Sequence, residues 1–229
     1  MTIRRIALTA LGFYGSLLAA LTLCISAQRI LAEPVVAAPS TIEFPYAIPG
    51  TTIVVQSVTG YDGPFLEDGT DREVVNVAAL IIRNVGAAIL ESVQISLRWS
   101  DGVYTFTGSY IPAGGTTVLL EQNGQPWQDN TFTQCTGSET LLQANLLFDE
   151  IAVAEQAMGT VILSNTTADT IYGITICYKT WLSTQDLYIG GVTYAMNIAH
   201  LLPEQTMYLY PDHYAVGYSK VVYIQYYSQ

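Results

Sequence analysis

The chain has 229 residues, of which 50% are hydrophobic and only 12% are charged, whereas an ordinary globular domain has about 25% charged residues. This composition excludes an intrinsically disordered chain, which combines few apolar residues with a high charge content. The formal net charge is −11, from eight basic and 19 acidic residues. Nucleic-acid binding is therefore excluded as well, because it needs a basic face to neutralise phosphates.

Residues 1–32 have the pattern of an export segment. Arg4 and Arg5 precede an uncharged run from Ile6 to Ala27, which is 22 residues long. Basic residues before an apolar run stay on the cytoplasmic side and direct the following chain outward. The apolar core of a signal peptide has about 7–15 residues and a membrane span about 20. The pattern thus predicts an N-terminal signal helix or transmembrane helix.

The localisation follows from this segment. We expect an extracytoplasmic protein that is either secreted after cleavage or held by a single membrane pass through residues 6–27. Residues 33–50 contain four prolines and few periodic apolar positions. Prolines at this density favour an extended chain, so this segment is predicted to be a tether for the part that follows.

The two cysteines beyond the leader suggest a disulfide. Removal of residues 1–32 leaves five basic against 19 acidic residues, a formal charge of −14, together with Cys135 and Cys177. An even pair of cysteines in an oxidising compartment predicts a bridge, which would stabilise the fold by roughly 4 kcal/mol through loop closure. Neither cysteine has a Cys or His neighbour at metal-ligand spacing, so we expect no zinc site and no cofactor.

From Thr51 onward, short runs rich in β-branched and aromatic residues alternate with turn residues, which predicts β-strands. The predicted strands are 51–59, 74–84, 89–99, 103–110 and 116–120, and then 159–165, 171–180, 187–199, 206–210 and 219–227. Asp101-Gly102 predicts a type I′ hairpin, because that turn needs positive φ at both positions. The stretch 139–156 fits a helical stripe as well as a strand, and we expect mostly strand.

The two halves of this pattern repeat each other. Superposing Asn84 on Asn165 gives an offset of 81 that aligns alternating apolar positions, and Ile111-Pro112 then corresponds to Leu202-Pro203 after an insertion. The aligned pairs are Val93 with Ile174, Ile95 with Ile176, and Leu97 with Tyr178. Two diverged copies of one β-unit without a long helical run predict an all-β chain of two β-sandwich modules, at residues 51–137 and 138–229.

The order of elements also resembles a known family. A hydrophobic strand ending in Asn, an alternating strand, a turn, an aromatic strand, Leu/Ile-Pro and a closing strand are similar to FxLYD-type and related immunoglobulin-like modules of bacterial exported proteins. The resemblance covers roughly residues 72–121 and, more loosely, 148–227. Leu97-Arg98-Trp99-Ser100-Asp101 stands where an aromatic-Tyr-Asp sequence is typical, and Tyr178-Lys179-Thr180-Trp181 departs further. The resemblance implies an immunoglobulin-like fold and export, and it implies no catalytic residues.

Catalytic signatures are scarce in the sequence. His200 and His213 are the two histidines, and no G-x-S-x-G motif accompanies a serine, so we expect no enzyme. The acidic residues between Asp62 and Glu73 form a Gly- and Pro-containing loop, for which a solvated surface is the simplest interpretation. Asp68 and Asp71 in this loop are the candidate ligands of a calcium ion, although their spacing is not that of an EF-hand.

Tyrosine is the most distinctive residue of the C-terminal third, which contains 11 of the 16 tyrosines. Half-buried strands favour tyrosine, which accounts for most of them. Tyr214 and Tyr218 lie instead in a Gly-containing loop beside Asp212 and His213. Because tyrosine provides rigid contact area at low entropic cost, these four residues are predicted to form a recognition surface.

Together these features predict an extracytoplasmic binding or structural module with a protein or glycan partner on the cell surface. One alternative is a carbohydrate-active or other enzyme that uses paired carboxylates of the acidic loop. Another is a subunit of a cell-envelope complex or filament, with the Tyr-rich C-terminal module as its contact surface.

Overall fold

The computed structural model describes residues 41–144, 146–156, 159–215 and 217–226, which belong to one compact unit that starts at Thr41. The predicted signal or anchor segment and the tether up to residue 40 lie outside the described residues. The described chain is all-β and contains no helix, as the sequence predicts. Accordingly, the described residues include no helix long and apolar enough to cross a membrane.

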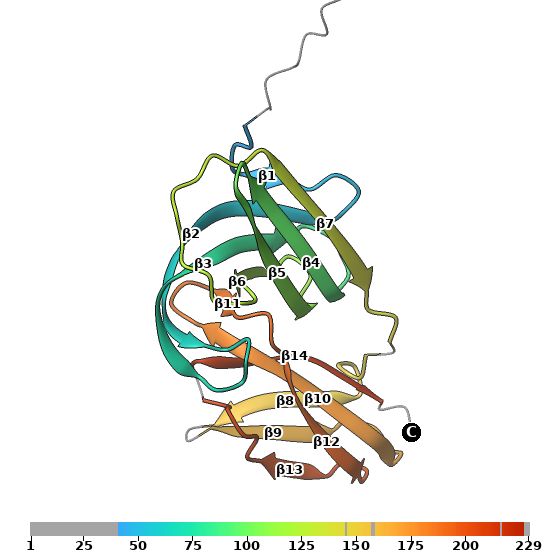
Figure 1. Cartoon of the computed structure of the whole chain (residues 1–229). Helices are drawn as coiled ribbons and strands as arrows, with labels where there is room; N and C mark the ends of the chain where they lie inside the picture. Colours follow the sequence, from blue (N-terminus) through green and yellow to red (C-terminus); the bar gives the residue numbers. More distant parts are fainter. Residues whose placement is uncertain (1–40, 145, 157–158, 216, 227–229) are drawn as a thin grey trace, which may run out of the picture. The chain divides into compact units, whose positions relative to one another are not determined.

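The N-terminal half (residues 41–144) and the C-terminal half (residues 146–226) each contain a set of strands (Figure 1). Those of the N-terminal half are β1 (Tyr46–Ala47), β2 (Ile53–Phe65), β3 (Arg72–Asn84), β4 (Leu90–Trp99), β5 (Gly102–Ile111), β6 (Thr116–Leu120) and β7 (Gln134–Leu141). Those of the C-terminal half are β8 (Ile151–Gln156), β9 (Thr160–Asn165), β10 (Ile171–Leu182), β11 (Leu187–Ile189), β12 (Tyr194–Leu201), β13 (Thr206–Leu209) and β14 (Ser219–Tyr226).

One large sheet runs through both halves. It has eight strands in the order β1-β2-β3-β6-β11-β10-β12, with β14 also paired to β10. Two three-stranded sheets, β5-β4-β7 and β13-β9-β8, complete the fold. One buried core contains residues of β2 and β3 as well as β4 and β5, and a second contains residues of β9 and β10. Each half therefore packs a three-stranded sheet against its own part of the large sheet.

The strand pairing confirms the internal repeat. In the N-terminal half β3 pairs with β2 and β6, and β4 pairs with β5 and β7. In the C-terminal half β9 pairs with β8 and β13, and β10 pairs with β12 and β14. The apolar residues that the offset of 81 aligns are all buried. The same six-strand unit thus occurs twice in the described chain.

Two buried asparagines hold equivalent positions in the repeat. Asn84 Nδ2 donates to the carbonyl oxygens of Ala88 (2.8 Å), Ile111 (3.3 Å) and Pro112 (3.1 Å). Asn165 Nδ2 donates to the carbonyl oxygens of Asp169 (2.8 Å), Leu201 (3.1 Å) and Leu202 (3.0 Å). Each amide therefore ties the end of one sheet to the opposite sheet, because its acceptors lie just before β4 or β10 and at the end of β5 or β12.

These contacts also correct the predicted alignment by one residue. The acceptors of Asn165 are the carbonyls of Leu201 and Leu202, so Ile111-Pro112 corresponds to Leu201-Leu202 rather than to Leu202-Pro203. The register agrees, since Leu90 faces Ile111 and Ile171 faces Leu201. The two prolines, Pro112 and Pro203, are therefore not equivalent in the repeat. The asparagine binds backbone carbonyls, so the position of the proline ring is not constrained.

The predicted hairpin turn is also displaced. Trp99 pairs with Gly102, so the two-residue loop is Ser100-Asp101, and neither residue has a positive φ. The turn is therefore not type I′. Gly102 lies in β5, where an added Cβ would collide with the indole of Trp99, which explains the glycine by close packing rather than by turn geometry.

Two predicted segment boundaries fall inside structured elements. The boundary between residues 137 and 138 lies within β7, which pairs with β4 up to Leu141. In the described part of the predicted tether, β1 pairs with β2 and Ile48 is buried in the N-terminal core. Residues 41–50 therefore belong to the fold. Of the described residues in the stretch 139–156, only those at its two ends are in strands, β7 and β8.

The predicted disulfide between Cys135 and Cys177 is absent, since both are free buried cysteines. Cys135 on β7 points into the core of the N-terminal half. Cys177 on β10 lies in a different cluster with Tyr188, Val222 and Tyr223. An even cysteine count suggested a bridge, but the two side chains fill separate apolar clusters.

We expect Asn84→Ala and Asn165→Ala each to lower the free energy of unfolding by about 2–3 kcal/mol, because each leaves buried carbonyls without a donor. Chemical denaturation of the full chain measures the change. Asn123→Ala, at an exposed asparagine, is the control and should change it by less than about 0.5 kcal/mol. If only one of the two alanine variants lowered the free energy of unfolding, Asn84 and Asn165 would not have equivalent roles.

We expect Cys135 and Cys177 to resist thiol reagents in the native protein and to react without prior reduction once the chain is unfolded. Burial raises the pKa of Cys135 to about 11 and raises that of Cys177, and only the thiolate reacts. Mass spectrometry of labelled peptides measures both states. A peptide pair linked through Cys135 and Cys177 would disprove this assignment.

Candidate functional site

The two halves meet along β6 and β11, which pair in parallel through Tyr188 with Thr117 and Ile189 with Val118. The Gly190 amide donates to the Val118 carbonyl, and the Ser109 amide donates to the Gly191 carbonyl, both at 2.8 Å. An added Cβ on Gly191 would overlap the carbonyl oxygen of Thr107. Only glycine therefore permits this approach of the two backbones.

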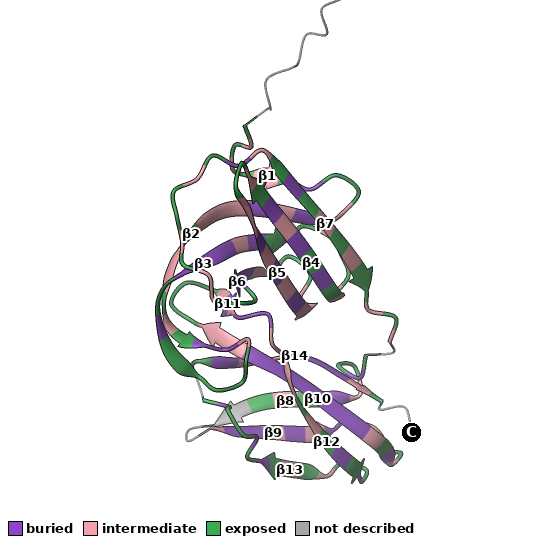
Figure 2. Ribbon diagram, viewed as in Figure 1, coloured by how far each residue is buried: buried purple, intermediate pink, exposed green. Residues whose placement is uncertain are grey.

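An apolar cluster fills the rest of the junction. Ile89, Tyr110 and Leu142 of the N-terminal half pack against the cluster around Tyr223 in the C-terminal half. The rings of Tyr110 and Tyr223 are 4.7 Å apart between centroids. Figure 2 shows that β10 is buried along most of its length. One face of β10 packs in the core of the C-terminal half, and the other face packs against residues of the N-terminal half.

Lys179 lies at the centre of this junction. Its side chain is fully buried. The ammonium donates to the carbonyl oxygens of Ser109 (3.0 Å), Gly191 (3.2 Å) and Val192 (2.8 Å), and to Thr193 Oγ1 (3.1 Å). Burial lowers the pKa of Lys179 to about 7, an effect that the charge of Glu67 opposes. Because the acceptors come from both halves, the lysine joins them.

Glu67 extends the same network from the loop after β2. Its Oε1 accepts hydrogen bonds from the amides of Gly191 (2.7 Å) and Leu120 (3.3 Å). Burial raises its pKa, and the two amides and Lys179 act in the opposite direction. The sequence pattern predicts a solvated loop for Glu67, and it does not single out Lys179 as a functional residue. The available signal was a lysine inside an otherwise apolar predicted strand, ITICYKTW.

The calcium candidates Asp68 and Asp71 have separate partners. Asp68 accepts from Thr70 through its amide (3.0 Å) and hydroxyl (2.6 Å), and from Arg72 Nε (2.9 Å). These bonds, those from Thr70 first, lower the pKa of Asp68 to about 2. Asp71 Oδ2 lies 3.4 Å from His213 Nδ1. In the described part of the chain, no three His, Cys, Asp or Glu side chains are grouped to hold a metal ion.

The predicted recognition loop lies against this acidic loop, across the junction. His213 stacks on Tyr194 with a centroid distance of 5.0 Å and faces Asp71. Asp212 is exposed, and its carbonyl accepts a hydrogen bond from the Tyr178 hydroxyl. The structure thus brings together two groups of residues that have no sequence pattern in common.

Tyr214 does not belong to a recognition surface. It is only 7% exposed and packs edge-on against Tyr178, with centroids 5.4 Å apart. Tyr218 in the same loop is 64% exposed. The loop position alone suggested exposure for both, but the Tyr214 side chain turns into the core of the C-terminal half. Of the four predicted residues, Asp212, His213 and Tyr218 are exposed.

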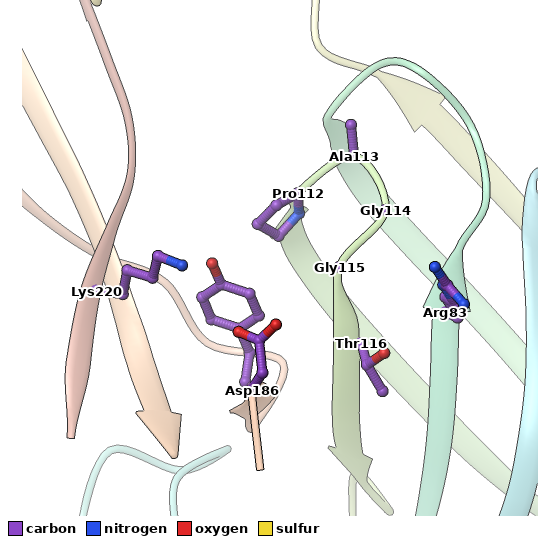
Figure 3. A pocket seen from close by; sticks show the side chains of 9 residues that line it. Arg83, Pro112, Ala113, Gly114, Gly115, Thr116, Asp186 and Lys220 are labelled. Carbon is purple, nitrogen blue, oxygen red and sulfur yellow. The ribbon is translucent and has the colours of Figure 1, made fainter. Parts of the chain in front are cut away.

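A polar pocket of about 270 Å³ opens elsewhere between the two halves (Figure 3). One wall is the β5–β6 turn with the neighbouring Arg83 and Thr116, and the other consists of Asp186, Tyr188 and Lys220. Lys220 Nζ lies 4.6 Å from the centroid of the Trp181 ring, and Trp181 Nε1 donates to Asp186 Oδ1 at 3.2 Å. No motif in the sequence indicates this pocket, because its residues come from distant segments.

The histidines show no catalytic pairing with a nucleophile among the described residues. The His213 side chain contacts Asp71 and Tyr194, and the His200 ring lies 6.3 Å from that of Tyr172. Nucleophilic catalysis would need a hydroxyl or thiol within hydrogen-bond reach of the base. What the arrangement offers chemically is hydrogen bonding and charge.

Comparison of the sequence with models of protein families gave no match, and comparison with curated proteins gave none either.

We expect Lys179→Met to lower the free energy of unfolding by about 3 kcal/mol or more, because it strands buried carbonyls and leaves Glu67 without a neighbouring positive charge. The matched control is Arg98→Met. Arg98 is the basic residue at the equivalent position of the repeat and is exposed, so its change should stay within about 0.5 kcal/mol. Chemical denaturation of both variants measures the difference, and equal stabilities would contradict the assigned role of Lys179.

Proposed function

We propose that the protein is an extracytoplasmic binding module, secreted or tethered through residues 1–32, in which two immunoglobulin-like β-sandwich modules act as one rigid unit. The support for the immunoglobulin-like assignment is the duplicated six-strand unit with one core in each half. The support for export is the basic and apolar pattern of the leader. Its partner is a protein or glycan on the cell surface.

The observation that carries the proposal is the uneven exposure of tyrosine. In the described N-terminal half, every tyrosine is buried or half-buried. In the C-terminal half, five tyrosines are 45% to 70% exposed, namely Tyr172, Tyr208, Tyr210, Tyr218 and Tyr226. Tyrosine is enriched at recognition surfaces because its ring is large and rigid and its hydroxyl forms hydrogen bonds.

The junction supports the same function. Lys179 and the β6–β11 pairing fix the C-terminal half relative to the N-terminal half. Loops fixed in this way lose less conformational entropy when a partner binds. The tether would then hold the N-terminal half near the membrane, with the tyrosine-bearing half available to a partner.

The exposed tyrosines equally favour a second candidate, a subunit of a cell-envelope complex or filament. In that case the partner surface includes further copies of the same chain. The two functions differ in the mass of the complex that the tyrosine surface forms, which an experiment can separate.

We expect a photo-crosslinking residue at Tyr210 or Tyr218 to give a discrete adduct when the full chain is produced in its own cell envelope. These positions are 70% and 64% exposed, so the replacement should not disturb the core. The control is the same residue at Asn123, on an exposed turn of the N-terminal half, where we expect no adduct.

The adduct mass separates the two candidates. A product at a whole-number multiple of the chain mass identifies self-assembly. A discrete product at any other mass identifies a separate partner. If Tyr210 and Tyr218 give no more product than Asn123, the tyrosine surface is not a binding surface and the proposal fails.

A further inference from the structure

We propose that the pocket between the β5–β6 turn and residues 186–188 binds a single anionic group, a carboxylate or a sulfate, carried on a sugar. This inference rests on the proposed binding function and specifies a ligand class for it. The pocket lies where the two halves meet, so the ligand would contact both. Its volume of about 270 Å³ is slightly smaller than the roughly 300–1,000 Å³ of most ligand pockets, which suits one sugar residue rather than a chain.

The distribution of positive charge carries the argument. The described chain contains five basic residues, and two of these have internal partners: Lys179 is fully buried and Arg72 pairs with Asp68 at 2.9 Å. Of the three that remain, Arg83 and Lys220 both line this pocket (Figure 3). The third is Arg98. In a chain with a formal charge of −11, this is a local concentration of positive charge.

Both cations retain capacity for a ligand. Among the described residues, no side chain forms an ion pair with Arg83 or Lys220. Arg83 is exposed, and its guanidinium can present two parallel N–H donors to a carboxylate or sulfate. Lys220 rests on the Trp181 ring, which orients its ammonium without neutralising it.

The remaining groups of the pocket fit a sugar. Asp186 has its Oδ1 occupied by the indole N–H of Trp181, and its other oxygen can accept from a sugar hydroxyl. Tyr188 lines the same wall as Asp186 and Lys220, and a tyrosine hydroxyl can both donate and accept a hydrogen bond. Gly114 in that turn has a φ of 69°, and an added Cβ there would meet nothing within 4 Å. The turn is therefore open at Gly114.

The net charge restricts the ligand further. A polyanion would be repelled by the many surrounding carboxylates, since a negative field lowers the local concentration of anions. A ligand with one negative group on a neutral polar body avoids most of this repulsion. D-glucuronic acid and glucose 6-sulfate have this character, and D-glucose is the same body without the charge.

The test is ligand-observed NMR with the full chain in detergent micelles, titrated separately with these three sugars at low ionic strength. We expect one or both charged sugars to bind at least about tenfold more tightly than glucose, because a charge-assisted contact contributes more than a neutral one. Comparison of the two charged sugars identifies the preferred anion. Equal binding of all three, or no binding up to millimolar concentration, would overturn the proposal.

Variants locate the binding. Arg83→Gln with Lys220→Gln should weaken the charged sugar at least about tenfold, whereas Arg98→Gln should leave its affinity unchanged. Thermal unfolding verifies that the variants are folded, and Lys220→Arg serves as a charge-preserving variant that should retain binding. If the double variant binds as the parent does, the ligand lies elsewhere. Photo-crosslinking at Tyr218 in the double variant separates the two proposals, since a retained adduct supports the binding function independently of the pocket.

Discussion

The buried ammonium of Lys179 is the constraint on which the arrangement of the two halves depends. An uncompensated buried charge costs several kcal/mol, so the lysine requires its oxygen acceptors. These come from Ser109 in β5 and from residues 191–193. The glycine at 191, the parallel pairing of β6 with β11 and the inward turn of Glu67 all bring those oxygens into range. The polar centre sets the register of the junction, and the apolar cluster around Tyr223 packs the rest of it.

Within each half, most of the fold could be predicted from the sequence because the deciding signals are local. Alternation of apolar and polar side chains identifies a strand with one buried face, and residues 93–97 follow it. The offset of 81 correctly related Asn84 to Asn165, whose amides make equivalent bonds. The errors were small displacements, such as the turn at Ser100-Asp101, where packing of Gly102 against Trp99 was mistaken for a turn requirement.

The junction could not be predicted in the same way, because its contacts join residues far apart in the chain. Cys177 packs in an apolar cluster to which residues of the N-terminal half also contribute. The even number of cysteines predicts a disulfide, but both cysteines are free. His213 meets Asp71, and Arg83 shares a pocket with Lys220, although neither pair has a sequence signature. For Tyr214, loop position implied exposure, whereas its ring packs on Tyr178. The candidate site residues are thus positioned by contacts between segments that are distant in the sequence, both across the junction and within the C-terminal half.

The repeat has a further consequence at one position. The offset of 81 places Arg98 at the position of Lys179, and Arg98 is exposed where Lys179 is fully buried. The outer face of β4 therefore lacks the residue through which the outer face of β10 is joined to a preceding unit. The two copies are therefore not interchangeable, because only the second has the buried lysine that joins it to the copy before it. A third copy could be added by the same contact only behind the second, and only if it carried its own buried lysine.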